Sequence, residues 1–318
     1  MTIVRGIPEH RGLFRNPVVT LGSFDGVHMG HMRIFSMVQN IARQKGGDPI
    51  VITFTEHPRK VITPKTPPRI LTTVDEKVSA IRSCGIGNII LLDFTAQMAQ
   101  MTATEFFNEI VLKKLGVIDV VVGYDHAFGR NREGNIDFLR EISKHRGFGV
   151  TRVEPKSFYS RPISSTWIRT ELEDGNVRLA SSLLGRRYAI SGTVSRGAGR
   201  GRTIGFPTAN LLPEDAGKVV PKDGVYAVTV LVAGTERFEG MLNIGTNPTF
   251  ANVEHTIEAH LFGFSGDIYG SAIEVEFVDR IRDEQKFGSV EELVAQIGRD
   301  GSAAREILRE AEGNGTIN

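Results

Sequence analysis

The alternation of strands and helices along the chain stops near residue 185, and this change constrains the fold most. Before it, short apolar runs alternate with segments whose apolar residues recur at helical spacing. The runs of buried-strand length are 18–21, 50–54, 89–92 and 117–122. Strand and helix in alternation predict an α/β fold with a doubly wound parallel sheet and right-handed crossovers.

Helix signals lie between these strands. Apolar residues recur at helical spacing over 34–42 and predict one buried helix face. Thr102 and Glu105 form a capping-box pattern, which predicts a helix start. Asn135 is a typical N-cap for a helix over 136–146.

The second half of the chain is rich in strands without helices between them. Gly and Pro turns separate them, and only 289–308 is strongly helical. This pattern predicts an antiparallel sheet or barrel, whereas 165–185 predicts two short helices. We therefore expect a domain over 1–163, bridging helices over 164–185 and a second domain over 186–318. The predicted strands are 188–194, 225–232, 240–244, 256–262 and 272–278.

Composition excludes several classes of protein. The single cysteine, Cys84, excludes an intrachain disulfide and a thiolate metal cluster. Lys and Arg number 38 against 37 Asp and Glu, so the net charge of +1 gives no general attraction to nucleic acid or anionic membranes. No apolar run reaches ~18 residues, and the N-terminus lacks the apolar core of a signal peptide. We expect a cytoplasmic protein that binds neither nucleic acid nor membrane.

A glycine-rich turn with two histidines follows the first strand. In doubly wound sheets ligands bind where strands end, and a helix N-terminus favours phosphate. Two imidazoles three positions apart can both donate hydrogen bonds to a triphosphate. Chance gives about 0.02 His-x-Gly-His patterns in a chain with 8 His and 35 Gly. The alternative is a surface loop with two unrelated histidines. The turn reads Gly22-Ser23-Phe24-Asp25-Gly26-Val27-His28-Met29-Gly30-His31.

Two further segments suit the same site. The segment 123–129 follows a predicted strand, so we expect it at the same edge of the sheet. The segment 163–169 begins a helix with three hydroxyls, which by themselves are more often an N-cap than a phosphate site. The two segments read Gly-Tyr-Asp-His-Ala-Phe-Gly and Ile-Ser-Ser-Thr-Trp-Ile-Arg.

A loop rich in glycine and arginine over 195–210 forms a second candidate site. It lacks the Gly-Lys-Ser/Thr of a Walker A loop, but its backbone N–H groups can still surround phosphates. Thr208 and Asn210 present oxygens on one side of an extended segment, and Mg²⁺ accepts such ligands. A flexible turn with a Pro-Thr corner is the alternative.

The first three segments resemble the nucleotidyltransferase half of prokaryotic FAD synthetases, within the His-x-Gly-His adenylyltransferase superfamily. The family patterns G-x-F-D-G-V-H-x-G-H, G-x-D-F-x-F-G and Ser-Ser-[Ser/Thr]-x-Ile-Arg occur in order, except that His126 replaces the usual Phe. The resemblance implies that His28 and His31 are catalytic and bind ATP phosphates. It implies further nucleotide contacts at Gly22, Ser23, Phe24, Asp25, Gly26, Ser164, Ser165, Thr166 and Arg169, and flavin contacts at Asp125, His126 and Phe128.

The second half resembles riboflavin kinases. The matching segments are 201–210, 221–227, 243–250 (Asn-Ile-Gly-Thr-Asn-Pro-Thr-Phe), 257–261 and 286–287. The resemblance implies a six-stranded antiparallel β-barrel, nucleotide contacts at Gly201, Arg202 and Thr208, metal contacts at Thr208 and Asn210, and a catalytic role for Asn210. It implies that Glu258 is the base that takes the ribityl hydroxyl proton. Without the resemblance, Glu258 would be a polar residue on the outer face of a strand.

Both resemblances together imply a bifunctional enzyme. The C-terminal kinase domain would phosphorylate riboflavin to FMN, and the N-terminal domain, an FMN adenylyltransferase, would convert FMN to FAD with release of pyrophosphate. ATP, riboflavin and FMN are then substrates, and Mg²⁺ accompanies ATP. One alternative is a chain that retains only one activity. The other is a non-catalytic flavin- or nucleotide-binding regulator. Self-association is left open.

Overall fold

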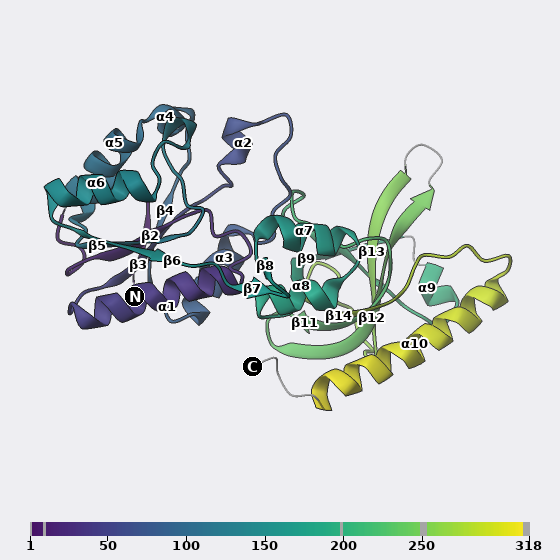
Figure 1. The fold of residues 1–318 in the computed structure, drawn as a ribbon. Helices are drawn as coiled ribbons and strands as arrows, with labels where there is room; N and C mark the ends of the chain where they lie inside the picture. Colours follow the sequence, from purple (N-terminus) through teal and green to yellow (C-terminus); the bar gives the residue numbers. More distant parts are fainter. Residues whose placement is uncertain (1, 9–10, 198–199, 249–252, 314–318) are drawn as a thin grey trace. The chain divides into compact units, whose positions relative to one another are not determined.

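The computed structural model describes residues 2–8, 11–197, 200–248 and 253–313, and it forms two compact units, Met1–Ser165 and Thr166–Asn318 (Figure 1). By this division the helices predicted within 165–185 belong to the second unit from Thr166 onward. The predicted polar tail beyond Gly313, and Thr249 and Phe250 of the kinase motif, lie outside the described residues.

A parallel six-stranded sheet organises the first unit. Its strand order is β1-β4-β3-β2-β5-β6, and every neighbouring pair is parallel. The strands are β1 (Thr2–Arg5), β2 (Val18–Leu21), β3 (Pro49–Phe54), β4 (Asn88–Leu92), β5 (Asp119–Gly123) and β6 (Gly149–Val153). A short hairpin follows, β7 (Ser157–Phe158) with β8 (Arg161–Pro162).

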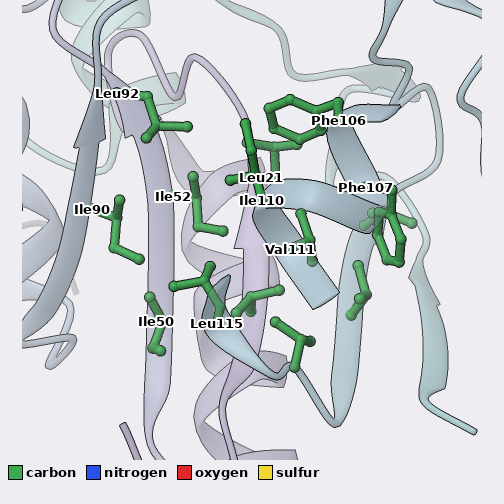
Figure 2. Packing of buried hydrophobic residues seen from close by; sticks show 14 of the residues in the cluster. Leu21, Ile50, Ile52, Ile90, Leu92, Phe106, Phe107, Ile110, Val111 and Leu115 are labelled. Carbon is green, nitrogen blue, oxygen red and sulfur yellow. The ribbon is translucent and has the colours of Figure 1, made fainter. Parts of the chain in front are cut away.

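Helices cover both faces of this sheet because its strands alternate apolar side chains between the faces. Ile50 and Ile52 lie in a cluster with Phe106, Ile110 and other side chains of the helical segment after Thr102 (Figure 2). Val51, between them, lies in a second cluster with side chains of α1 and α3. The helices are α1 (Met29–Gln44), α2 (Arg59–Ile62), α3 (Val74–Ser83), α4 (Ala96–Gln100), α5 (Ala103–Phe106), the π-helix η1 (Phe107–Leu115), the 3₁₀-helix η2 (Arg130–Arg132) and α6 (Ile136–Arg146).

Local capping fixes where these helices begin. The predicted capping box of Thr102 and Glu105 is present, and Asn135 accepts bonds from the first turn of α6. An additional capping box, formed by Thr73 and Glu76, starts α3.

The strand order places the candidate site at a topological switch point. From β2 the chain proceeds through β3 and β4 toward one edge, whereas β5 and β6 lie on the other side of β2. In such sheets the crevice for a ligand opens at the carboxyl ends of the two strands where the direction reverses. The turn 22–31 follows β2 and the segment 123–129 begins at the last residue of β5, so both predicted segments lie at the carboxyl ends of these two strands.

A closed six-stranded barrel organises the second unit. Its order is β10-β13-β12-β11-β14-β9, and every pair is antiparallel. The strands are β9 (Ala189–Ser195), β10 (Ala209–Pro213), β11 (Gly224–Val232), β12 (Glu236–Pro248), β13 (Val253–Leu261) and β14 (Ala272–Arg282). The helices are α7 (Ser165–Glu173), α8 (Val177–Leu184), α9 (Arg200–Thr203) and α10 (Val290–Gly313), seen in yellow in Figure 1.

Apolar side chains of α10 pack on one side of the barrel. Ala304 and Leu308 are buried with Ala227, Met241 and Val278 of three strands. The predicted fold class, a doubly wound parallel sheet followed by a six-stranded antiparallel barrel, is confirmed. No helix in the described ranges combines the length and the apolar character needed to cross a bilayer.

Candidate active sites

The turn after β2 has a strained backbone. Phe24 and Val27 have φ angles of 46° and 41°, and Gly26 has 83°. A positive φ is rare for a β-branched residue such as Val27, and strain of this kind concentrates at functional sites. The ring of Phe24 covers Gly22, where an added Cβ would lie 3.0 Å from Phe24 Cζ. A side chain at Gly22 would therefore require the Phe24 ring to shift by a few tenths of an ångström.

The two predicted catalytic histidines lie together at the start of α1. Their rings stack with centroids 3.6 Å apart and an interplanar angle of 20°. The ring of Phe24 meets that of His31 edge to face at 5.2 Å. An added Cβ at Gly30 would lie 3.0 Å from Cε1 of His28, so a side chain there would disturb the pair. The structure thus brings His28 and His31 together at the N-terminus of α1, and a helix N-terminus favours phosphate.

Asp25 has a structural role in this turn that the sequence does not reveal. Its carboxylate is buried and accepts bonds from the backbone N–H groups of Leu71 and Thr72 at 3.0 to 3.1 Å. The Thr72 hydroxyl donates to Asp25 Oδ1 at 3.2 Å and accepts from the Gly26 N–H at 3.0 Å. Asp25 therefore ties the turn to the segment that leads into α3.

Lys77 of α3 was not among the predicted site residues. It is buried beneath the turn, and its ammonium donates to the carbonyl oxygen of Phe54 at 2.7 Å and to that of Ser23 at 3.3 Å. Burial lowers the pKa of Lys77 to about 8, and the charge of Asp25 opposes that shift. The sequence holds one indication of this role. Lys77 occupies a position on the same helix face as the apolar residues Val78 and Ile81, which are buried.

The third predicted segment reaches the same turn. Ser165 Oγ donates to the carbonyl oxygen of Asp25 at 2.9 Å. The carbonyl oxygen of Ile163 lies 3.7 Å from the position of an added Cβ at Gly30. Ser164 is half-buried beside Ser165. Thr166 and Arg169 lie on α7 within the second unit, where Thr166 is exposed and Arg169 half-buried.

The three residues with an implied flavin role differ in their surroundings. Asp125 is exposed after β5, and its carbonyl oxygen accepts from Arg132 at 3.3 Å. Burial, with a smaller effect of the Arg132 charge, lowers the pKa of His126 to about 4. The ring of Phe128 packs against Phe106 at 5.7 Å and lies 5.7 Å from that of His126. Phe128 thus contributes to the core of the first unit.

The predicted kinase residues meet on the second unit. Asn210 of β10 lies directly opposite Glu258 of β13, so their side chains share one face of the sheet. The Thr208 hydroxyl donates to Glu258 Oε2 at 3.0 Å. All three are half-buried, whereas their neighbours Ala209 and Ala259 are buried. Thr208 and Glu258 are fifty residues apart in the sequence, and the pairing of the barrel strands brings them into contact.

Glycines allow the loop before β10 to approach these side chains. An added Cβ at Gly197 would lie 2.2 Å from Asn210 Nδ2. At Gly201 it would lie 2.2 Å from the carbonyl oxygen of Phe206 and 3.4 Å from Thr208 Oγ1. The carbonyl oxygen of Gly201 accepts from the Phe206 N–H at 2.8 Å, which closes the turn. The side chain of Arg202, implied to bind nucleotide, lies outside the described part of the chain.

Two family models match the chain. One, described as FAD synthetase, matches residues 11–167, and one described as riboflavin kinase matches residues 184–308. A bifunctional riboflavin kinase/FMN adenylyltransferase from Escherichia coli K12 is 39% identical over 312 residues, which cover 97% of this chain and 98% of the relative. A protein of the same name from Bacillus subtilis is 38% identical over 291 residues, which cover 90% and 91%.

The chain belongs to the bifunctional riboflavin kinase/FMN adenylyltransferase family. The two predicted activities, and their order along the chain, are those of the family. A crystal structure from Streptococcus pneumoniae, named there a macrolide-efflux protein, superposes with a TM-score of 0.87 at 35% identity and covers 96% of this chain and 99% of its own. It therefore shares the fold of both units.

The predicted metal contacts Thr208 and Asn210 have a donor set that suits Mg²⁺. They offer a hydroxyl and an amide oxygen, hard ligands that Mg²⁺ accepts alongside phosphate and water. Within the described ranges, no group of three His, Cys, Asp or Glu side chains could hold a metal by itself. The residues fit a metal that arrives with ATP.

The barrel also places the first residue of the predicted kinase motif 243–250 beside these side chains. Asn243 of β12 lies opposite Glu258 on the side away from Asn210. Met241, two residues earlier on the same face, packs in the cluster beneath α10. The row Asn210, Glu258 and Asn243 therefore lies on the outer face of the barrel.

Proposed function

We propose that His28 and His31 are the groups that hold the ATP triphosphate during adenylylation of FMN. The observation that carries this role is the stacked pair at the first turn of α1, at the switch point of the sheet. The FMN phosphate oxygen attacks the α-phosphorus while the bond to pyrophosphate breaks. Hydrogen bonds from the two imidazoles stabilise the charge on the departing pyrophosphate, so no covalent enzyme intermediate is required.

The other residues of this site are assigned by their position. Gly22, Gly26 and the backbone of Ser23 and Phe24 let the chain approach the nucleotide closely. The hydroxyls of Ser164, Ser165 and Thr166, with Arg169, bind phosphates. Asp125 and His126 contact the flavin side. We also place the reactions in the cytoplasm, where ATP is available and the Cys84 thiol stays reduced.

In the kinase site we assign Glu258 as the general base. The riboflavin 5′-hydroxyl loses its proton to the Glu258 carboxylate, its oxygen bonds to the γ-phosphorus, and ADP leaves with the bridging oxygen. The Thr208–Glu258 hydrogen bond, with Asn210 in register beside it, supports this assignment. Thr208 and Asn210 would hold Mg²⁺, which neutralises phosphate charge when bound. Gly201 and Arg202 belong to the nucleotide loop.

One time course tests these roles. The wild-type chain is incubated with riboflavin, ATP and Mg²⁺, and riboflavin, FMN and FAD are separated by chromatography. Replacing both His28 and His31 with Ala removes contacts worth ~1.5–3 kcal/mol each, so FAD formation should stop while FMN accumulates. Glu258→Ala should slow FMN formation by about 10² to 10⁴ while FAD still forms from supplied FMN.

Matched control variants separate these roles from general damage. His145→Ala changes an exposed histidine of α6, and Glu236→Ala changes an exposed glutamate of β12, so both should keep both activities. Undiminished FAD synthesis in the double histidine variant would refute the first assignment. A Glu258→Ala rate within threefold of wild type would refute the second.

A further inference from the structure

A lysine occupies a core position of α3. The buried face of this helix holds Val78, Ala80 and Ile81, and Lys77 lies among them with 6% of its surface exposed. Lysine is almost never fully buried unless its charge is compensated. A methionine of similar length would fill the same space without bringing a charge into the core. The ammonium therefore calls for a reason beyond packing.

The ammonium of Lys77 joins the ends of two neighbouring strands. It donates to the carbonyl oxygen of Phe54, the last residue of β3, and to that of Ser23, two residues after β2. The Thr53 hydroxyl donates to the same Ser23 oxygen at 3.1 Å. Ser23 is therefore held by two donors immediately before Phe24, the first residue of the turn with a positive φ.

The charged and titratable side chains nearest to Lys77, among the described residues, lie on three segments of the chain. From the turn after β2 the carboxylate of Asp25 faces it, and this carboxylate holds Leu71 and Thr72. After the end of β3 the next charged groups are Glu56, which pairs with Lys60 at 3.5 Å, and His57, which accepts from the Arg59 N–H. On α3 itself Glu76 is held by the capping box.

Resting on the adenylyl-transfer site proposed above, the geometry points to Lys77 as a positioning residue of FMN adenylylation. Its protonated ammonium holds the Ser23 carbonyl and, through Asp25, the strained turn in the conformation that places the two histidines. The lysine touches neither nucleotide nor flavin. Loss of its charge loosens the turn, and the transfer rate falls while the kinase on the same chain is unaffected.

The test uses the full-length chain and measures both activities between pH 6.5 and 9.5. In the wild type the ratio of FAD synthesis from FMN to riboflavin phosphorylation should fall with a midpoint near pH 8, because burial lowers the Lys77 pKa to about 8. Lys77→Met should lower FMN adenylylation at least tenfold at pH 7 and remove this fall. Lys77→Arg keeps a positive charge at every pH in the range, so it should retain activity and lose the alkaline fall.

A control variant and separate measurements distinguish a positioning role of Lys77 from misfolding and from failure of the proposed function. Lys113→Met changes an exposed lysine of η1 and should behave as wild type. Riboflavin phosphorylation is the reference activity, and circular dichroism with thermal unfolding reports whether the first unit, which holds Lys77, is folded in each variant. The Lys77→Arg pH profile decides the matter if Lys77→Met is insoluble. Equal adenylylation in wild type and Lys77→Met, or an unchanged alkaline fall in Lys77→Arg, overturns the positioning role. A wild-type chain that makes no FAD would instead overturn the proposed function.

Discussion

The charge on Lys77 also couples the stability of the first unit to pH. Its pKa in the folded chain, about 8, lies below the ordinary value of 10.5. Between these values the unfolded chain keeps a proton that the folded chain has released, so the free energy of unfolding rises with pH. We expect this group to add about 3 kcal/mol between pH 7 and pH 11. Urea unfolding followed by circular dichroism should show the rise in wild type and a smaller one in Lys77→Met.

His126 lies at a position where the FAD synthetase pattern has Phe. Because the pKa of His126 is lowered, the effect of replacing it with Phe can be tested by changing the pH. Its pKa of about 4 keeps the ring neutral in the folded chain, whereas the unfolded chain takes up a proton as the pH falls below 6.5. The first unit should therefore lose stability from pH 6.5 toward pH 4. In His126→Phe we expect a smaller acid shift of the melting temperature and FAD synthesis within about twofold at pH 7. If acid lowers the melting temperature of His126→Phe more than that of the wild type, the interpretation that His126 is neutral in the folded chain is wrong.

Single residues show where the sequence suffices and where it does not. The motifs predicted that Thr208, Asn210 and Glu258 share one site, and the barrel brings these three residues together, while their roles stay a prediction. The place of Asp25 could not be predicted. Its carboxylate accepts hydrogen bonds from Leu71 and Thr72, forty-six and forty-seven residues away, and only the fold brings those N–H groups to it. Lys77 was missed because a lysine ordinarily indicates a solvated helix face.

The loop before β10 is the element on which the kinase site depends most directly. In Gly197→Ala the new methyl group would lie 2.2 Å from Asn210 Nδ2, so the Asn210 side chain has to turn away. We expect riboflavin phosphorylation to fall at least tenfold, with the melting temperature nearly unchanged because only a side-chain end moves. FAD synthesis from supplied FMN should persist. Gly298→Ala in α10, where nothing lies within 4 Å, is the matched control and should keep both activities.

The predictability of the elements follows their burial. The central strands β2, β3, β4 and β5 were predicted because both of their faces are buried and their sequences are continuous apolar runs. The edge strands β1 and β6 were missed, since exposed and half-buried residues leave them without such a run. The helix α3 was missed because Lys77 interrupts its apolar face.

The position of the boundary between the two units can be tested with fragments of the chain. Our sequence-based boundary places 164–185 between two domains, and the structure places Thr166 onward in the second unit. There Arg178 of α8 pairs with Asp279 of β14 at 2.6 Å, and the Lys222 N–H donates to the Leu172 carbonyl oxygen. We therefore expect fragment 166–318 to melt several degrees above fragment 186–318, and both to phosphorylate riboflavin.

The complementary fragments report on the first site. Fragment 1–185 keeps Thr166 and Arg169 and should make FAD from FMN, whereas fragment 1–165 lacks them and should fold without this activity. Circular dichroism checks folding, and chromatography of FMN and FAD checks turnover. A fragment 166–318 that is folded but makes no FMN would show that the kinase site borrows residues from the first unit.

Closure of the barrel decides where the molecule is vulnerable to aggregation. The six described barrel strands pair around a circle and leave no row of free backbone groups, whereas the parallel sheet ends at β1 and β6. Arg5 on β1 and Arg152 on β6 are exposed charges that oppose the addition of another strand at these edges. When heating partly unfolds the protein, we therefore expect strand pairing between molecules to begin at the edges of the sheet in the first unit. Substitutions that neutralise Arg5 and Arg152 should make heated samples turbid sooner.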